Sequence, residues 1–152
     1  FDGDFFAHME EIDFCWRAQL AGYRIRVEPR STVFHVGGGT LPNNSPQKIY
    51  LNFRNNLCML FKNLSPGTFW PVLFSRMVLD GMAALVFLVQ GHPDFFKKVF
   101  RAHIDFHRQR KSLHEKRRAI QRHRVARPHG ILRNSIILLH AFGYRTFDKV
   151  MR

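Results

Sequence analysis

The sequence has little cysteine and little negative charge. Its 152 residues include two cysteines, Cys15 and Cys58, and no CxxC spacing. Both cysteines lie in apolar, helix-like patterns, so we expect buried free thiols in a reducing compartment rather than a disulfide framework or a cysteine metal site. The chain has no internal repeats, and it opens on patterned sequence without a recognisable signal peptide. We therefore expect one domain or a fragment of a larger protein.

Acidic residues are too few to balance the basic ones. The chain has 24 Lys and Arg against 11 Asp and Glu, which gives a net charge of +13. Residues 97–127 hold twelve basic and two acidic residues, whereas residues 1–50 hold five and six. This excess predicts that the C-terminal half contacts an anionic surface, either a membrane leaflet or nucleic acid. No nucleic-acid-binding module is recognisable, and the neighbouring apolar segment favours the membrane.

Long uninterrupted apolar runs are also missing. Residues 69–90 have the length of a membrane-spanning helix, but Arg76 and Asp80 interrupt them, and the unbroken run covers only residues 81–89. The two charged residues are four apart and can pair on one helix face. Because each charge near the bilayer centre costs about 2.5–3.5 kcal/mol, we expect a helix that lies in the interface or dips into it. A true span and a helix buried in a helical subdomain are the alternatives.

Periodicity predicts a short α/β region followed by helices. Residues 9–21 and 46–64 have apolar side chains at three- and four-residue spacings, which predicts two helices. Between them, alternation in residues 23–28 predicts a strand, residues 31–36 predict a second strand, and a glycine-rich loop follows. Further helices are expected over residues 68–90, 94–125 and 131–142. A boundary near Ser65 separates the two zones.

Three acidic residues are concentrated at the start of the first predicted helix. Glu10, Glu11 and Asp13 lie within four positions, although like charges this close repel each other. One interpretation is structural: Glu10 and Glu11 favour the positive end of the helix dipole, and Asp13 pairs with Arg17. The other is catalytic: a carboxylate here removes a proton from a substrate hydroxyl as a general base.

The flanking sequence favours the catalytic interpretation. The stretch "FDGDFFAHMEEIDFCWRAQLAGYRI", followed by "HVGGGT" and "SPQKIYLNFRNNLCMLFKNL", closely resembles the C-terminal part of family 2 glycosyltransferases, particularly the bacterial rhamnosyltransferase-like branch. The resemblance covers roughly residues 1–110. It implies an α/β fold of the GT-A type, with the C-terminal part of the catalytic domain in residues 1–64 and a helical, membrane-associated region in residues 65–152.

The resemblance also implies a reaction and its residues. Family members transfer a sugar from a nucleotide-diphospho-sugar to an acceptor with inversion, and they use a divalent metal, Mg²⁺ or Mn²⁺. Glu11 stands where they have an aspartate as the catalytic base, and Glu10 directly precedes it. Asp13 and Arg17 match the family's positioning groups, and Trp16 with Arg17 forms a candidate contact with the diphosphate or substrate.

The "HVGGGT" loop corresponds to the leaving-group side of the family's site. His35 matches a metal-binding histidine, although hard cations prefer oxygen ligands. Backbone N–H groups of Gly37, Gly38 and Gly39 can approach phosphate oxygens closely, and Thr40 can add a hydroxyl.

The family's metal-binding D-x-D motif is expected elsewhere. Asp2 and Asp4 have that spacing, but they match the family's "FDxxFF" stretch, so we expect them to order a loop. The true D-x-D and the nucleotide-binding half are then expected outside this chain.

The implied partners are a nucleotide-diphospho-sugar donor, a glycan or lipid-linked acceptor of cell-surface polysaccharide synthesis, and an anionic membrane. These partners place the protein at the cytoplasmic face of the plasma membrane. Two other function classes stay open: a basic nucleic-acid-binding module, and a non-catalytic membrane adaptor that retains a degenerate transferase segment. The first leaves the acidic cluster and the glycine loop unexplained, whereas the glutamate at position 11 favours the second.

Overall fold

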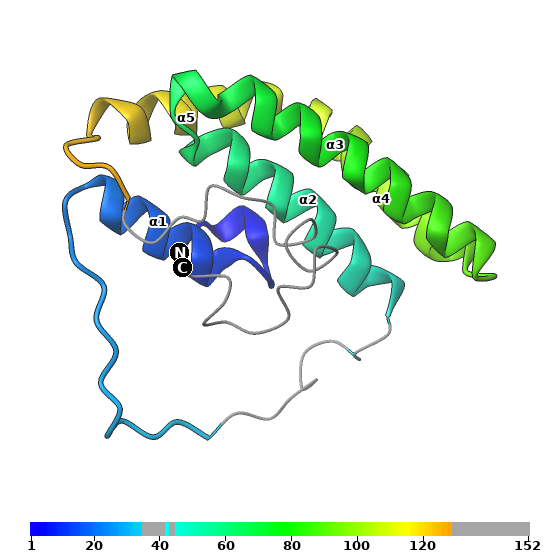
Figure 1. Cartoon of the computed structure of the whole chain (residues 1–152), viewed down its shortest axis with the longest axis horizontal. Helices are drawn as coiled ribbons and strands as arrows, with labels where there is room; N and C mark the ends of the chain where they lie inside the picture. The colour runs from blue at the N-terminus through cyan, green and yellow to red at the C-terminus, as the bar shows by residue number, and fades with distance from the viewer. Residues whose placement is uncertain (35–41, 43–44, 129–152) are drawn as a thin grey trace, which may run out of the picture.

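The computed structural model describes residues 1–34, 42 and 45–128, and within them it contains helices only (Figure 1). A short 3₁₀ helix, η1, is followed by five α-helices: η1 Gly3–Phe5, α1 Glu10–Leu20, α2 Pro46–Asn63, α3 Pro66–Val89, α4 Pro93–Arg108 and α5 Arg110–Arg122. No strand occurs in these residues, so the expected α/β fold is wrong. The helices predicted over residues 9–21, 46–64 and 68–90 are confirmed to within two residues at each end. The helix predicted over residues 131–142 lies outside the described residues.

The predicted strand over residues 23–28 has no pairing partner among the residues that the structure describes. In Figure 1 this segment leaves α1 and runs away from the helices. Its alternating apolar side chains are exposed, with Tyr23 at 71%, Ile25 at 46% and Val27 at 87%. Alternating apolar and polar residues suit a strand with one buried face. A strand forms, however, only where neighbouring strands supply its backbone hydrogen bonds. Residues 31–34 of the second predicted strand are likewise irregular.

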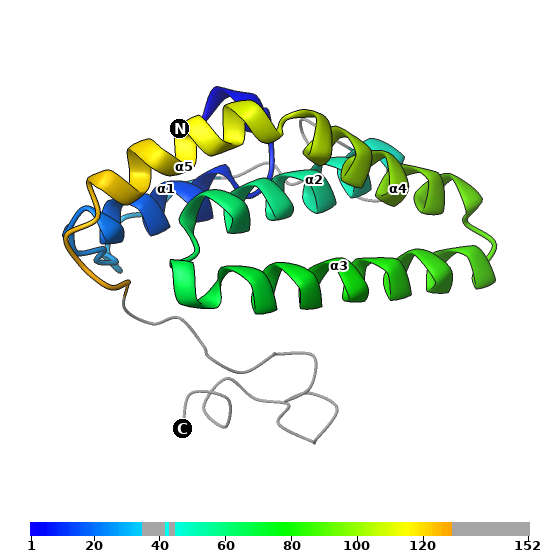
Figure 2. The ribbon, with the colours of Figure 1, turned by 90° about the horizontal axis from the view of Figure 1, so that it is seen from above.

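Helix α2 is central to the fold. It packs against each of the other four α-helices. Figure 2 shows α3 along one side of the molecule and α4 with α5 along the other, with α2 between them. The ring of Phe61 in α2 lies 5.2 Å from Phe69 of α3, 5.7 Å from Phe106 of α4 and 4.9 Å from His114 of α5, measured between centroids. These edge-on contacts join four helices through one aromatic side chain.

The single basic helix expected over residues 94–125 is two helices. Gln109 ends α4 and precedes α5, with φ −84° and ψ 3°. Past this break, Arg117 donates to the Phe61 carbonyl at 2.6 Å, and Gln121 donates to the carbonyls of the next three residues at 3.2–3.4 Å. The last carbonyls of a helix have no partner within it. The turn at Gln109 therefore lets α5 cap the C-terminal end of α2.

Candidate functional site

A strained loop precedes α1. Phe6 has φ 62° and ψ −60°, and the Ala7 N–H donates to the Phe5 carbonyl at 2.7 Å, which together form a γ-turn of the rare positive-φ kind. His8 and Met9, which follow Ala7, also have positive φ values, of 68° and 71°. Such conformations cost about 1–3 kcal/mol each in residues other than glycine, and they persist only where the surroundings impose them.

Helix α2 imposes this conformation through two adjacent side chains. Arg54 donates to the Asp4 carbonyl at 2.7 Å. Asn55, whose side chain is fully buried, donates through Nδ2 at 2.8–2.9 Å to three loop carbonyls, those of Phe5, Ala7 and His8. Neither residue was singled out from the sequence, because the partners lie about fifty positions away. The available signal was the run of three adjacent polar residues, Arg54, Asn55 and Asn56, in the middle of α2.

The clamped loop places Glu10 and Glu11 in the first turn of α1. The Glu11 side chain is exposed. Glu10 is half-buried, and its Oε2 atom is buried without a hydrogen-bond partner. Because the N-terminal end of a helix favours negative charge, two carboxylates can be held side by side here. The Glu11 carboxylate is open to solvent, and the Glu10 carboxylate is partly enclosed.

Asp13 is buried and fully engaged. Its carboxylate accepts from Arg17 Nε at 2.8 Å and from Asn63 Nδ2 at 2.8 Å, and it lies 3.1 Å from Lys62 Nζ. The predicted pair of Asp13 and Arg17 is therefore confirmed. Lys62 and Asn63 come from the end of α2, and their part was missed from the sequence. These contacts fix α1 against α2.

Asp2 and Asp4 also pair with lysines. Lys62 lies 2.5 Å from Asp2, and Lys116 of α5 lies 2.5 Å from Asp2 and 2.6 Å from Asp4. Burial by itself raises the pKa of Asp2, but hydrogen bonds from Lys116 and Lys62 outweigh it and hold that pKa well below its usual range. The two carboxylates thus order the N-terminal turn, which is the role expected from the sequence.

Several buried polar atoms of the loop, α1 and α2 have no hydrogen-bond partner within the described residues. They include His8 Nε2, Glu10 Oε2, Trp16 Nε1, Arg17 Nη2 and Asn56 Oδ1. Asn56 lies beside the strained loop, because its Nδ2 is 3.9 Å from Met9 Sδ. Folded proteins leave few buried polar atoms unpaired, so such atoms call for an explanation, such as ordered water or a bound ligand. The predicted contact residues Trp16 and Arg17 both belong to this group.

The remaining predicted site residues, His35, Gly37, Gly38, Gly39 and Thr40, lie outside the described residues. Within residues 1–34, 42 and 45–128, no three His, Cys, Asp or Glu side chains gather as a metal site. Both cysteines are free, and burial raises the pKa of Cys58 to about 11.

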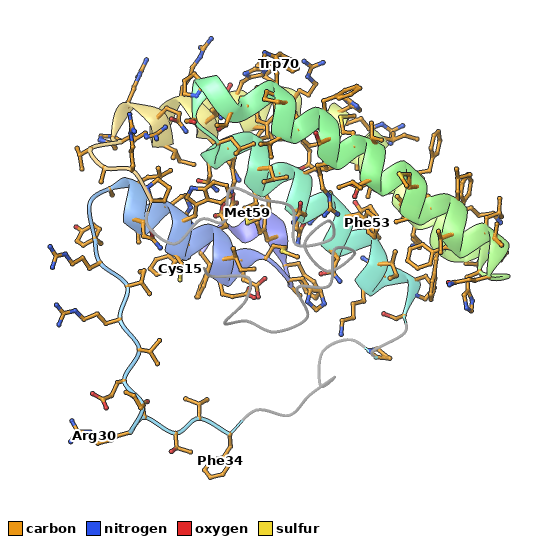
Figure 3. All side chains as sticks on the ribbon, in the orientation of Figure 1. Cys15, Arg30, Phe34, Phe53, Met59 and Trp70 are labelled. Atoms are coloured by element: carbon orange, nitrogen blue, oxygen red, sulfur yellow. The ribbon has the colours of Figure 1, made fainter. Side chains whose placement is uncertain are left out.

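Helix α3 turns its charged pair inward beside buried Phe69 and Leu73, and it exposes many of its other apolar residues. Asp80 is 2% exposed and pairs with Arg76 at 2.7 Å and with His103 of α4 at 3.1 Å, so the predicted pair of Arg76 and Asp80 is confirmed. Trp70, which is 68% exposed, projects from α3 away from the other helices (Figure 3). The rest of this outer face consists of exposed apolar side chains: Val72, Phe74, Val78, Met82, Leu85, Val86, Leu88 and Val89. In the described part of the chain, α3 is the one helix long and apolar enough to cross a membrane, with a mean hydropathy of 2.0.

Comparison of the chain with known protein families finds no matching family, and comparisons with characterised proteins and with solved structures find no match either.

Proposed function

We propose that this chain carries the acceptor-activating base of an inverting glycosyltransferase that builds a cell-surface glycan. The observation that carries the proposal is the clamped, left-handed loop before α1, which presents Glu10 and Glu11 together at the positive end of a helix. Glycine adopts positive φ values without strain, so a turn selected only for stability would ordinarily use it. Strained positive-φ residues of other types cluster at functional sites. The motif resemblance to family 2 glycosyltransferases supports the same reading of the two glutamates.

The proposed reaction is a single displacement. The Glu11 carboxylate takes the proton of the acceptor hydroxyl, the hydroxyl oxygen bonds to the anomeric carbon, and the bond from that carbon to the diphosphate oxygen breaks. The electron pair of that bond leaves with the nucleoside diphosphate, whose added charge Mg²⁺ or Mn²⁺ would neutralise. Glu11 serves as the base because its side chain is exposed, whereas one oxygen of Glu10 is enclosed.

The unpaired atoms along α1 supply contacts for the reactants. Arg17 Nη2 and Trp16 Nε1 are buried donors within two turns of Glu11, and they suit oxygen atoms of a sugar or a diphosphate. His8 Nε2 and Asn56 Oδ1 lie on the loop side of α1 and suit acceptor hydroxyls. Asp13 takes part by holding α1 in place, since all of its described contacts go to protein donors.

Separate substitution of the two glutamates tests this proposal in the intact protein that carries the chain. Glu11→Gln should lower turnover by about 10²–10⁴-fold without changing the affinity for the sugar donor, because an amide cannot accept the proton. The same loss in Glu10→Gln alone would make Glu10 the base instead. Near-normal turnover in both variants would contradict the proposal. Glu28→Gln, which removes an exposed charge between α1 and α2, is the control for a general charge effect.

A further inference from the structure

We infer that α3 lies flat in one leaflet of an anionic membrane, with its outer face among the acyl chains and with α2, α4 and α5 on the aqueous side. The inference is independent of sugar transfer. It rests on the direction in which α3 faces, on the satisfaction of its polar groups and on the charges along the neighbouring helix α4.

The outer face of α3 is unlike that of a helix at a protein–water boundary. Such a helix turns its polar side chains to water and its apolar stripe to the core. On α3, the charged pair of Arg76 and Asp80 faces α4, while Trp70, Phe74 and Leu85 are 68%, 69% and 58% exposed. Charged residues of membrane-embedded helices characteristically face the protein interior and pair there. The outer face is therefore suited to lipid.

Two other polar side chains of α3 also have partners within the protein. Ser75 donates to the Pro71 carbonyl at 2.8 Å, and the Thr68 hydroxyl lies 2.8 Å from that of Ser65. In hydrocarbon a polar group must find its partner inside the protein, because no water is present. On the exposed side of α3, Ser75 meets this condition.

Helix α4 extends the apolar face and adds cations at its edge. Phe100 is 63% exposed and lies three residues before His103, which reaches Asp80, so Phe100 lies on the edge of α4 beside α3. Lys97 is exposed and lies one helical turn before Phe100. With it, a cationic border runs along α4, made of Lys97, Arg101 and Arg108, whose side chains are 67–75% exposed. Asp94 lies 3.9 Å from Lys97, and Asp105 pairs with Arg101 at 3.2 Å and with Arg108 at 3.3 Å, so the border keeps an excess of one positive charge. An apolar face beside a row of cations matches acyl chains beside anionic headgroups.

The packing of α4 disfavours a spanning orientation. After a turn at Gly91, where φ is +80°, α4 runs back alongside α3 (Figure 2). If α3 crossed the bilayer, Lys97, Arg101 and Arg108 would be carried into the hydrocarbon core. A helix lying flat leaves these cations at the level of the headgroups.

The same charges favour lipid over a second copy of the chain. In a two-fold symmetric dimer the same patch appears on both subunits, so the two cationic borders would face each other wherever the two-fold axis runs across α3. Like charges brought together in an interface are unfavourable, whereas anionic headgroups are complementary. The occupant that fits this surface is therefore an anionic leaflet.

Depth measurements along α3 test the orientation. The chain has two tryptophans, so Trp16→Phe leaves Trp70 as the single reporter. With Trp70→Phe added, the reporter is moved by Phe74→Trp, Val78→Trp, Leu85→Trp or Val89→Trp, and quenching is measured with lipids brominated at different depths. Vesicles contain phosphatidylcholine with phosphatidylglycerol. A flat helix gives the same shallow depth at all positions. A depth that is greatest in the middle of α3 would show a span, and absence of quenching would show no insertion; either result overturns the inference.

Matched variants test the apolar and cationic parts separately. Leu85→Glu on the outer face should weaken vesicle binding by about tenfold or more, whereas Ile12→Glu, at a similarly exposed apolar position on α1, should not. A second variant with glutamine at Lys97, Lys98, Arg101, Arg108, Arg110 and Lys111 should bind weakly to anionic vesicles, and wild-type binding should fall as salt rises. Equal binding to neutral and anionic vesicles at all salt concentrations would overturn the proposal that the leaflet is anionic. If the protein forms a stable dimer or binds duplex DNA, and does not bind vesicles, the proposal that lipid covers this face is overturned.

Discussion

Lys62 Nζ lies 3.1 Å from Asp13 Oδ1, and the two side chains are 1% and 0% exposed. Lys62 also pairs with Asp2. One cation of α2 thus joins the N-terminal turn to α1, and so helps to fix the position of Glu10 and Glu11. Because both carboxylates are largely removed from water, Lys62 compensates part of their charge, together with Lys116 at Asp2 and Arg17 at Asp13.

Replacing Lys62 should therefore be costly. Lys62→Met keeps most of the volume but leaves Asp2 and Asp13 without this cation, and it should lower the free energy of unfolding by about 3–5 kcal/mol. Urea denaturation measures this change. Lys97→Met is the matched control, because Lys97 is 75% exposed and pairs loosely with Asp94, so its effect should stay within about 0.5 kcal/mol. Equal effects of the two substitutions would show that the buried bridge contributes nothing particular.

Asp2 should make stability depend on pH. Its pKa is lower in the folded protein than the value of about 3.9 expected in the unfolded chain. Its contribution is therefore fully present above about pH 4 and is lost as the pH falls further. Asp2→Asn should lower the melting temperature at neutral pH, and the gap from wild type should shrink below about pH 4. The control Asp94→Asn, at a 76% exposed position, should show a much smaller gap. A constant gap for Asp2→Asn would contradict the account.

Phe6 should tolerate glycine better than a helical residue does. Its φ of 62° suits glycine, and its ring is 73% exposed, so Phe6→Gly should leave the free energy of unfolding unchanged or raise it by up to about 1 kcal/mol. Phe14 is 46% exposed within α1, and Phe14→Gly should lower that free energy by about 1 kcal/mol or more. Thermal unfolding compares the two variants. A larger loss for Phe6→Gly would mean that the γ-turn is not strained.

His35 should act on the leaving group. His35→Ala is expected to weaken the metal-dependent binding of a nucleoside diphosphate, measured by calorimetry with and without Mg²⁺, and to leave the melting temperature unchanged. His123→Ala, at the exposed C-terminal cap of α5, is the control. Unchanged metal-dependent binding together with a lower melting temperature would instead indicate a structural histidine.

Local patterns in the sequence predicted the local structure. Apolar spacing located α1, α2 and α3, and four-residue spacing predicted the pairs of Asp13 with Arg17 and of Arg76 with Asp80. Such contacts depend on residues one helical turn apart. The orientation of α3 was not determined by spacing, because its inward stripe includes both charged and apolar side chains.

Interactions between distant residues were missed. The alternation in residues 23–28 indicated a strand, but a strand also requires neighbours, and the described residues supply none. At Gln109 the chain turns so that Gln121 of α5 can donate hydrogen bonds to carbonyls at the end of α2, and this contact joins residues far apart in the sequence. The acidic cluster was found from its motif, whereas the clamp by Asn55 depends on loop carbonyls about fifty residues away.

The anomeric configuration of the first product tests the central claim most directly. If a carboxylate at the start of α1 acts as a base in a single displacement, the intact protein converts an α-linked nucleotide-diphospho-sugar into a β-linked product, and a β-linked donor into an α-linked one. Proton NMR of the product, recorded before the anomers exchange, gives the configuration. Inversion, lost together with turnover in Glu11→Gln or in Glu10→Gln, is the result expected. Retention of configuration, or no sugar transfer from any donor, would contradict the account.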